Sequence, residues 1–260
     1  MVIKLESWKL LRLNDKSLQD ISKKLFIKTY HMKTIGLIGG MSWESSAVYY
    51  KLINERLKTL LGGHHSAKSV MVSVDFSEIE LLQRKNDWNK LNKLMVNAAL
   101  QLERANADLI ILCTNTMHLC TEEIVKNTSI PFIHIAEATG VEIKKKPITK
   151  VGLLGTKFTM EKDFYKKIIS DMGIEVITPN QNDRTIVHQI IFNELVHGKI
   201  TEESKEEYKT IIKKLENNGA QGVILGCTEI PLLIKPDDID IPVFDTTKIH
   251  VESAIKWALQ

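Results

Sequence analysis

From residue 32 onward, short apolar runs alternate with longer stretches whose apolar residues recur every three or four positions. The runs predict strands at 34–40, 70–76, 107–113, 130–135, 150–156, 174–179, 222–227 and 241–245. Between them, SSAVYYKLINERLKTLL (45–61) and WNKLNKLMVNAALQLERAN (88–106) predict amphipathic helices. Continuous apolar strands separated by helices are typical of parallel sheets that are covered on both faces. The pattern therefore predicts an α/β protein.

The chain also contains an internal repeat. ERANADLIILCTNT (103–116) aligns without a gap on ENNGAQGVILGCTE (216–229), at a constant offset of 113. GLIGGMSWESSAVYYKLI (36–53) also matches GLLGTKFTMEKDFYKKII (152–169), with one residue gapped. We therefore expect two pseudo-symmetric domains, each with a mainly parallel sheet flanked by helices, and an active site in the cleft between them, where ligands of open α/β sheets bind. The expected boundaries are 32–141, 142–246, and a return of 247–260 to the first domain.

The repeat bears on the polar loop CTNTMH, which follows the apolar run ending at residue 112. In the ungapped alignment Cys113 lies opposite Gly226, whereas Thr114 lies opposite Cys227. Neighbouring residues on a strand point to opposite faces. If Cys227 points into the cleft, Thr114 does so from the other side, and Cys113 is expected to pack in the core.

The charge distribution argues against a nucleic-acid partner. Residues 1–31 hold seven Lys and Arg against three Asp and Glu, so they contribute +4 to the formal net charge of +3, and the rest of the chain carries −1. The first 31 residues break the pattern of the rest, and we interpret them as an N-terminal extension or an upstream start, with a surface-binding or partner-binding helix as the alternative. No apolar run is long enough to span a membrane, and three scattered cysteines favour the reducing cytoplasm.

Several side chains are candidates for chemistry. Cys227 ends a strand and precedes a predicted helix with Pro231 in its first turn, a position where unpaired N–H groups lower a thiol pKa. The loops TNT (114–116), TE (228–229) and GGMSWE (39–44) offer N–H groups and hydroxyls for a carboxylate, with Ser42 as a helix cap. No loop has the spacing of a dinucleotide site or a P-loop.

Other polar and aromatic residues receive a structural interpretation. His118 is expected to pack or to cap a helix. His64 and His65 have no carboxylate or cysteine at ligand spacing, so no metal site is expected. Trp43, Tyr49 and Tyr50 fall in one predicted helix and are assigned to the core.

The segments GLIGGMSWES, VDFSEIELLQ, CTNTMH and GCTEI, spread over residues 32–256, resemble the cofactor-independent aspartate/glutamate racemases. The resemblance implies two pseudo-symmetric α/β domains, inversion of the Cα of an acidic amino acid without pyridoxal phosphate, and no cofactor. The family commonly uses two cysteines on opposite faces of the substrate. Matched by position, the second is Cys227, and the first is replaced by Thr114, as in the L-aspartate/glutamate-specific or broad-specificity branch.

The same matching implies that the substrate pocket is lined by Met41, Ser42, Gln83, Asn115, Thr116, Thr228 and Glu229. Some aspartate-specific members carry basic residues near Gln83 and shortly before Gly198. In this sequence Arg84 follows Gln83, and Val196 and His197 stand in place of the lysine, so strict aspartate specificity is in question. The family is commonly dimeric, which makes a homodimer a partner to test.

The exchange of cysteine for threonine has a kinetic consequence. A threonine hydroxyl is far too weak an acid to act as a free base near neutral pH, whereas a thiolate is accessible. We therefore expect a kinetically asymmetric racemase that turns over one enantiomer faster than the other. The resemblance to this branch of the family favours the L enantiomer. Two alternatives stay open: an arylmalonate-type decarboxylase or another single-cysteine isomerase such as a hydantoin racemase, and a non-catalytic amino-acid-binding protein.

Overall fold

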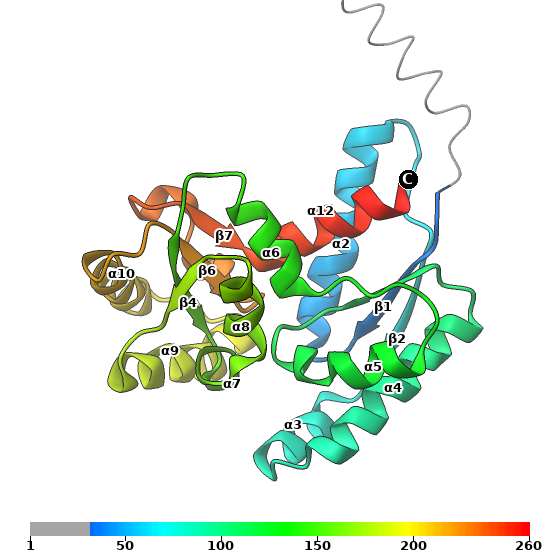
Figure 1. Ribbon diagram of the computed structural model, residues 1–260, viewed down its shortest axis with the longest axis horizontal. Helices are drawn as coiled ribbons and strands as arrows, with labels where there is room; N and C mark the ends of the chain where they lie inside the picture. Colours follow the sequence, from blue (N-terminus) through cyan, green and yellow to red (C-terminus); the bar gives the residue numbers. More distant parts are fainter. Residues whose placement is uncertain (1–31) are drawn as a thin grey trace, which may run out of the picture.

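Two parallel sheets form the centres of two lobes, which lie side by side in the computed structural model (Figure 1). The structure describes residues 32–260, and the predicted N-terminal extension, 1–31, lies outside the described residues. The strands are short, continuous and apolar, and helices cover both faces of each sheet. The predicted α/β class is confirmed.

The first lobe is built on a three-stranded sheet with strand order β2-β1-β3, in which both pairings are parallel. One face packs under α3, α4 and α5, and the other packs under α2 and the C-terminal helix α12. Its elements are β1 (Ile35–Gly39), α2 (Trp43–Leu61), β2 (Ser69–Ser73), α3 (Phe76–Arg84), α4 (Trp88–Arg104), β3 (Leu109–Leu112), the 3-10 turn η2 (Thr116–Cys120) and α5 (Thr121–Asn127).

The second lobe has a four-stranded parallel sheet with order β5-β4-β6-β7. Helices α9 and α10 pack on one face, and α6 and α8 pack on the other. Its elements are β4 (Lys150–Gly155), α7 (Lys157–Glu161), α8 (Asp163–Asp171), β5 (Glu175–Ile177), α9 (Gln181–Asn193), η3 (Leu195–His197), α10 (Glu202–Asn217), β6 (Val223–Gly226), α11 (Ile230–Leu233), η4 (Pro236–Asp238) and β7 (Val243–Asp245).

The two ladders have the same register, as the internal repeat predicts. Gly36 of β1 pairs with Ile110 of β3, and the repeat-equivalent Gly152 of β4 pairs with Val223 of β6. Ile110 and Val223 are separated by the offset of 113 found in the sequence. Counting forward from these pairs, residue 114 leaves the first sheet where residue 227 leaves the second.

The fourth strand is where the two halves differ. The predicted strand at 130–135 makes only a single bridge, between Ile110 and Phe132, whereas the matching segment forms β7. The backbone path is nevertheless conserved, because Ile110 N donates to Pro131 O at 2.8 Å and Val223 N donates to Pro242 O at 2.9 Å. The segment at 130–135 thus turns away from the first sheet after this one bridge.

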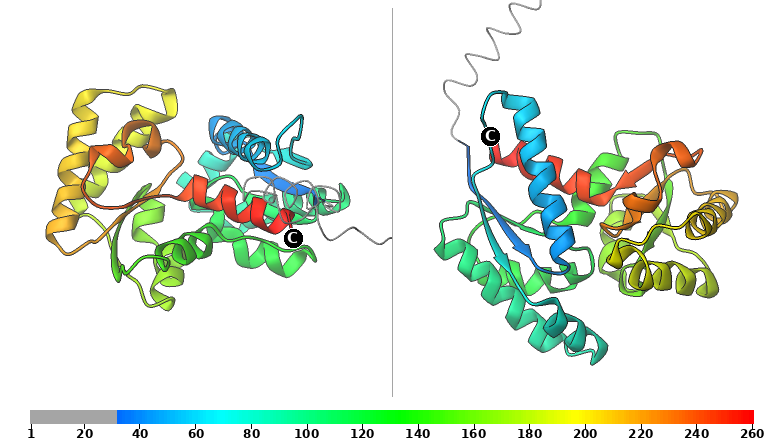
Figure 2. Two further views of the ribbon diagram at one scale, coloured as in Figure 1. Left: turned by 90° about the horizontal axis from the view of Figure 1, so that it is seen from above. Right: turned by 180° about the vertical axis from the view of Figure 1, so that it is seen from behind.

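Two helices each follow the sheet of one lobe and pack on the sheet of the other lobe. Helix α6 (Ile135–Ile143) follows the first sheet but packs on the second, and α12 (Thr246–Ala258) follows the second sheet but packs on the first, beside α2. Figure 2 shows α12 running along the first lobe. The C-terminal end reaches the start of β1, where Lys33 N donates to Ala258 O at 3.1 Å. The two helices therefore connect the lobes.

Helix α2 corrects one assignment made from the sequence. Tyr49 is fully buried, but Trp43 and Tyr50 are 69% and 53% exposed. A helix that covers one face of a sheet buries only one stripe of its surface. Tyr49 lies on that stripe and Trp43 and Tyr50 lie on the opposite side, so only Tyr49 belongs to the core. Within residues 32–260, no helix combines the length and apolarity that crossing a membrane requires.

Candidate active site

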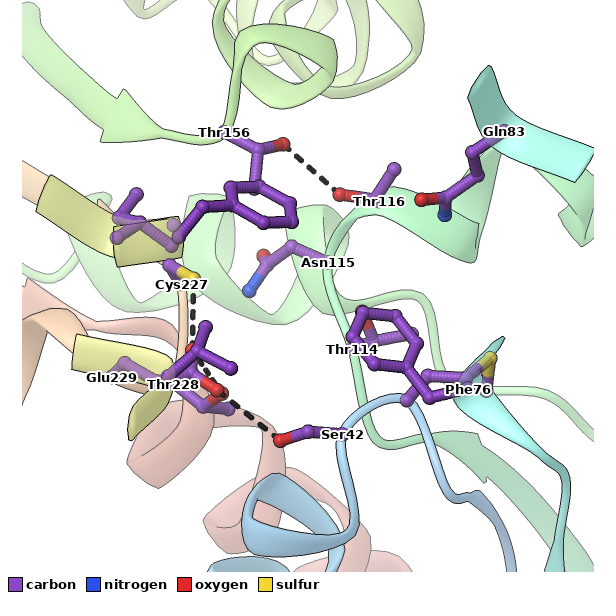
Figure 3. A pocket seen from close by; sticks show the side chains of 15 residues that line it. Ser42, Phe76, Gln83, Thr114, Asn115, Thr116, Thr156, Cys227, Thr228 and Glu229 are labelled. Carbon is purple, nitrogen blue, oxygen red and sulfur yellow. Dashed lines mark hydrogen bonds between the residues drawn. The ribbon is translucent and has the colours of Figure 1, made fainter. Parts of the chain in front are cut away.

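A pocket between the lobes gathers every site residue nominated from the sequence. It encloses about 550 Å³ of non-atom space, part of it open to solvent. Figure 3 shows Cys227 and Thr114 on opposite sides of this pocket, with Asn115 between them. The nominated residues that line it are Met41, Ser42, Gln83, Thr114, Asn115, Thr116, Cys227, Thr228 and Glu229.

The turn after β6 brings a thiol and a carboxylate together. The Sγ of Cys227 donates a hydrogen bond to Oε2 of Glu229 at 2.9 Å, and the hydroxyl of Thr228 donates to the same oxygen at 2.7 Å. From the first lobe, the hydroxyl of Ser42 reaches the other carboxylate oxygen at 3.5 Å. These contacts are the dashed lines at the lower left of Figure 3. Glu229 is therefore an acceptor for the proton of the Cys227 thiol.

The environment of Cys227 corrects the expectation of a lowered thiol pKa. Desolvation in the pocket is the largest effect and raises the pKa of Cys227 well above its ordinary value, and the charge of Glu229 raises it further. The backbone N–H groups of Thr228 and Glu229 act in the expected direction but are outweighed. The helix that follows, α11, has only four residues. Desolvation and the charge of Glu229 thus favour the protonated thiol of Cys227.

The turn after β3 is held by contacts from both lobes. His118 Nδ1 donates to the carbonyl oxygen of Thr114 at 2.8 Å. Asn115 Nδ2 donates to Oγ1 of Thr246 at 3.2 Å, and that hydroxyl donates to Leu225 O at 2.9 Å. The turn that carries Thr114 is thus fixed by hydrogen bonds on either side of it, from His118 to the Thr114 carbonyl and from Asn115 to Thr246.

Cys113 is a core residue, as the alignment predicted. It is fully buried in the apolar cluster under α2 and α12, and burial raises the pKa of its thiol. Its carbonyl oxygen accepts a hydrogen bond of 2.6 Å from the hydroxyl of Ser45. Since Cys113 faces the core and Thr114 lines the pocket, the two neighbours have the opposite orientations expected along a strand.

The turn after β1 brings Met41 and Ser42 to the pocket. Gly40 has φ of +92°, and a Cβ at this position would lie 2.1 Å from the carbonyl oxygen of Val74, so only glycine fits. Ser42 caps α2 as predicted, because its hydroxyl accepts from Ser45 N at 3.3 Å. The tight turn and the cap together fix the first lobe's contribution to the site.

His118 belongs to a buried histidine cluster at the junction of the lobes. Its ring lies 4.6 Å from that of His134 and 5.7 Å from that of His250, measured between centroids. His118 Nε2 accepts from Ile135 N at 3.2 Å, and His250 accepts from the Tyr49 hydroxyl at 2.9 Å. Burial lowers the pKa of His134 and of His250 to about 4. The cluster is neutral, and it orients the turn that carries Thr114.

The remaining polar candidates lie away from the pocket. Arg84 is ion-paired with Glu80 at 2.5 Å and its side chain is 74% exposed. His64 and His65 are exposed on the turn after α2. Within residues 32–260, no group of three or more His, Cys, Asp and Glu side chains is arranged to hold a metal ion.

Sequence reasoning missed the residues that close the pocket from other elements. Of these residues, only Thr156 could have been found from the sequence, because it is the repeat equivalent of Gly40. Its hydroxyl hydrogen-bonds to that of Thr116 across the cleft at 3.1 Å. The others come from α3, α9 and η3 and the end of β6, and had no motif to mark them: Phe76, Ile191, Phe192, Val196 and Gly226.

The arrangement can move a proton at a carbon atom that is held between the two turns. Cys227 supplies a thiol with a carboxylate acceptor 2.9 Å away. The opposite side offers the Thr114 hydroxyl and the carboxamide of Asn115, whose Oδ1 is buried and has no hydrogen-bond partner among the described residues. An unpartnered buried acceptor is costly, and an ammonium or amide donor on a ligand would satisfy it.

Comparisons with known proteins bear on the chemistry of this pocket. A family model described as Asp/Glu/Hydantoin racemase matches residues 38–254. Among curated proteins, the chain is similar to the broad specificity amino-acid racemase RacX of Bacillus subtilis (strain 168), with 24% identity over 86% of this chain and 98% of that protein.

Solved structures extend the likeness to the fold. A candidate Asp/Glu racemase from Yersinia pestis is 52% identical with a TM-score of 0.84, and the match covers 88% of this chain and 100% of that one. An aspartate racemase homologue from Pyrococcus horikoshii OT3 is 39% identical with a TM-score of 0.79, over 88% and 100% of the two chains. Both matches cover most of the residues described here.

Proposed function

This chain belongs to the Asp/Glu/hydantoin racemase family, and we propose that it inverts the Cα of an amino acid with Cys227 on one face and Thr114 on the other. The observation that carries the proposal is the shared register of the two ladders, which gives residues 114 and 227 equivalent positions in the two lobes. Both side chains line one pocket. A planar carbanion between them can lose a proton on one side and gain one on the other.

The polar groups of the pocket are proposed to bind the α-carboxylate and the α-ammonium, which all amino acids share. The α-carboxylate lies against the N–H groups and hydroxyls of the turn after β3, at Asn115 and Thr116. The α-ammonium lies near Asn115 Oδ1, a buried acceptor without a partner among the described residues, and near the Glu229 carboxylate. A positive charge at this position attracts the thiolate of Cys227 directly and so opposes the desolvation and the Glu229 charge that raise the thiol pKa.

The proposed proton path runs through Glu229. The thiol proton of Cys227 passes to Oε2 of Glu229, and the thiolate then removes the Cα proton of the bound enantiomer. The carbanion takes a proton on its other face from the Thr114 side, directly or through a water molecule. Solvent restores the proton on that side and accepts the one held by Glu229, so each turnover leaves the enzyme unchanged.

The two directions of the reaction are proposed to differ in kcat. A threonine hydroxyl does not start the reverse step as readily as a thiolate does. Since enantiomers have equal free energies, kcat/KM is the same in both directions, and the asymmetry can appear only in kcat and KM separately. We propose L as the enantiomer with the higher kcat, following the branch of the family that carries threonine in this position.

Hydrogen exchange at Cα tests this proposal. The full chain is incubated in D2O with the L or D form of aspartate, glutamate and a panel of other amino acids, because the Bacillus subtilis relative carries a broad-specificity name. Loss of the Cα–H NMR signal with inversion is the expected result. Release of carbon dioxide from an arylmalonate without amino-acid exchange would assign a decarboxylase. Binding without either reaction would assign a binding protein.

A further inference from the structure

The charges around the pocket leave no counter-ion for a second carboxylate on the substrate. Among the described residues that line it, Glu229 is the only charged side chain, and there is no lysine or arginine. Arg84, which the sequence places beside the lining residue Gln83, points outward to Glu80. A substrate with an acidic side chain would therefore bring one more negative charge toward Glu229, with no cationic side chain among the lining residues to neutralise it.

The neutral donors opposite the catalytic turn are already engaged with protein partners. The hydroxyls of Thr116 and Thr156 bond to each other at 3.1 Å, and Thr156 also accepts from Thr159 N at 3.4 Å as the cap of α7. Gln83 Nε2 donates to the Sδ of Met117 at 3.1 Å. Since a carboxylate accepts hydrogen bonds only, it would have to draw Gln83 Nε2 away from Met117, and from the Thr116–Thr156 pair it could take only the hydroxyl hydrogen that is not already donated.

The rest of the wall is apolar and comes from both lobes. Met41 and Phe76 line it from the first lobe, and Ile191, Phe192 and Val196 line it from the second. Ile191 is buried, and Phe192 and Val196 are half-buried against the core of the second lobe. Apolar side chains favour contact with apolar groups that leave water, and they penalise a buried charge that finds no partner.

We propose that this pocket takes an amino acid with an uncharged, largely apolar side chain in preference to aspartate and glutamate, with Phe192 and Val196 bordering the side-chain subsite. The inference rests on the proposed racemase function and assigns its substrate class. A zwitterionic amino acid adds no net charge to the pocket. Its ammonium meets the acceptor groups of Asn115 and Glu229, and its side chain lies against the apolar wall.

Isosteric substrates give the first test. L-leucine has nearly the shape of L-aspartate with the two carboxylate oxygens replaced by methyl groups, and L-methionine, which is uncharged and of similar length, is paired with L-glutamate. The full chain is assayed by Cα–H exchange in D2O, and kcat/KM is expected to be higher by about tenfold or more for the uncharged member of each pair. L-lysine is expected to be slower than L-methionine.

The outcomes separate this inference from the racemase function itself. Equal or faster exchange of aspartate, glutamate or lysine would overturn the substrate class and leave the racemase standing. Absence of exchange with every amino acid would overturn the racemase function, and the substrate class would fall with it.

A charge introduced at Val196 gives the second test. Val196→Lys provides a cation at the pocket wall and is expected to raise the ratio of aspartate to leucine kcat/KM by about tenfold or more. Val196→Met, of similar length and without charge, should keep that ratio within about threefold of wild type. An equal shift in both variants, or no shift in Val196→Lys when its thermal unfolding matches that of Val196→Met, would remove Val196 from the subsite.

Discussion

The turn after β3 and the turn after β6 leave their sheets at equivalent points, yet their surroundings are different. Cys227 has a carboxylate on its own turn, with Glu229 Oε2 2.9 Å from the sulfur. The ionisable groups that follow Thr114 on its turn are His118, which is buried and bonded to the Thr114 carbonyl, and Cys120, which is buried and has its thiol pKa raised by desolvation. The turn after β6 can therefore move a proton, whereas the turn after β3 holds a hydroxyl in place.

This difference locates the asymmetry of the site in a few side chains and not in the backbone. The ladders agree in register, so residues 114 and 227 follow equivalent positions of the two sheets. A duplicated fold would support two equal acid–base groups at these positions. Here the second lobe keeps the ionisable pair, and the first lobe contributes hydroxyls, an amide and a rigid support.

The largest expected effect comes from removing the thiol. Cys227→Ser should lower the rate of Cα exchange by about 1,000-fold or more, because a serine hydroxyl is far less acidic than a thiol. Cys113→Ala is the matched control, since that cysteine packs in the core, and its rate should stay within about threefold of wild type. Retention of most of the activity in Cys227→Ser would place the base elsewhere.

Removing the acceptor should have the next largest effect. Glu229→Gln eliminates a charge that raises the pKa of Cys227, so the thiol should react with iodoacetamide at lower pH than in wild type. Exchange should nevertheless slow by about 100-fold, because the thiol proton has lost its acceptor. Glu203→Gln, at an exposed site on α10, should change neither measurement. An unchanged alkylation profile in Glu229→Gln would show that the two groups are not coupled.

The support of the Thr114 turn should be sensitive to acid. His134 and His250 have pKa values of about 4 in the folded chain against 6.5 ordinarily. Above pH 6.5 both are neutral whether folded or unfolded, and their contribution to stability is fully present. As the pH falls from 6.5 to 4, the unfolded chain binds protons that the folded chain excludes, so the free energy of unfolding should decrease by a few kcal/mol, roughly.

A variant isolates this contribution from that of titrating carboxylates. His134→Asn keeps a side chain that can cap α6 and removes one of the two histidines, so urea denaturation at pH 7 and pH 4.5 should show a smaller loss than wild type. His64→Asn, at an exposed position, should match wild type. Identical losses in all three proteins would exclude His134 as the titrating group.

The smallest expected effect restores symmetry between the turns. In wild type, kcat from the L enantiomer should exceed kcat from the D enantiomer by about tenfold or more. Thr114→Cys supplies a second thiol and should bring this ratio to within about threefold of one, as followed by circular dichroism from either enantiomer. Thr114→Ser keeps a hydroxyl and should keep the imbalance. A wild-type ratio near one would contradict the assigned role of Thr114.

Much of the fold followed from local patterns. The apolar runs marked β1, β3, β4 and β6, and the repeat gave the correct equivalence of Thr114 and Cys227 before any contact was known. The segment at 130–135 was predicted as a strand and makes only one bridge. Its apolar pattern matches that of the second half, but strand pairing depends on how the chain leaves the sheet, and a run of six residues does not record that.

The sequence by itself determined the α/β class, the duplication and the residues that line the pocket on the two repeated turns, because periodicity and self-similarity are properties of the chain alone. Only the tertiary structure decided that the Cys227 thiol lies beside Glu229 in a desolvated pocket that raises its pKa, that Arg84 faces away, and that α9 and η3 supply an apolar wall. Those properties depend on desolvation, on distances between charges and on which segments meet across the cleft. They arise when distant parts of the chain come together, and no local pattern encodes them.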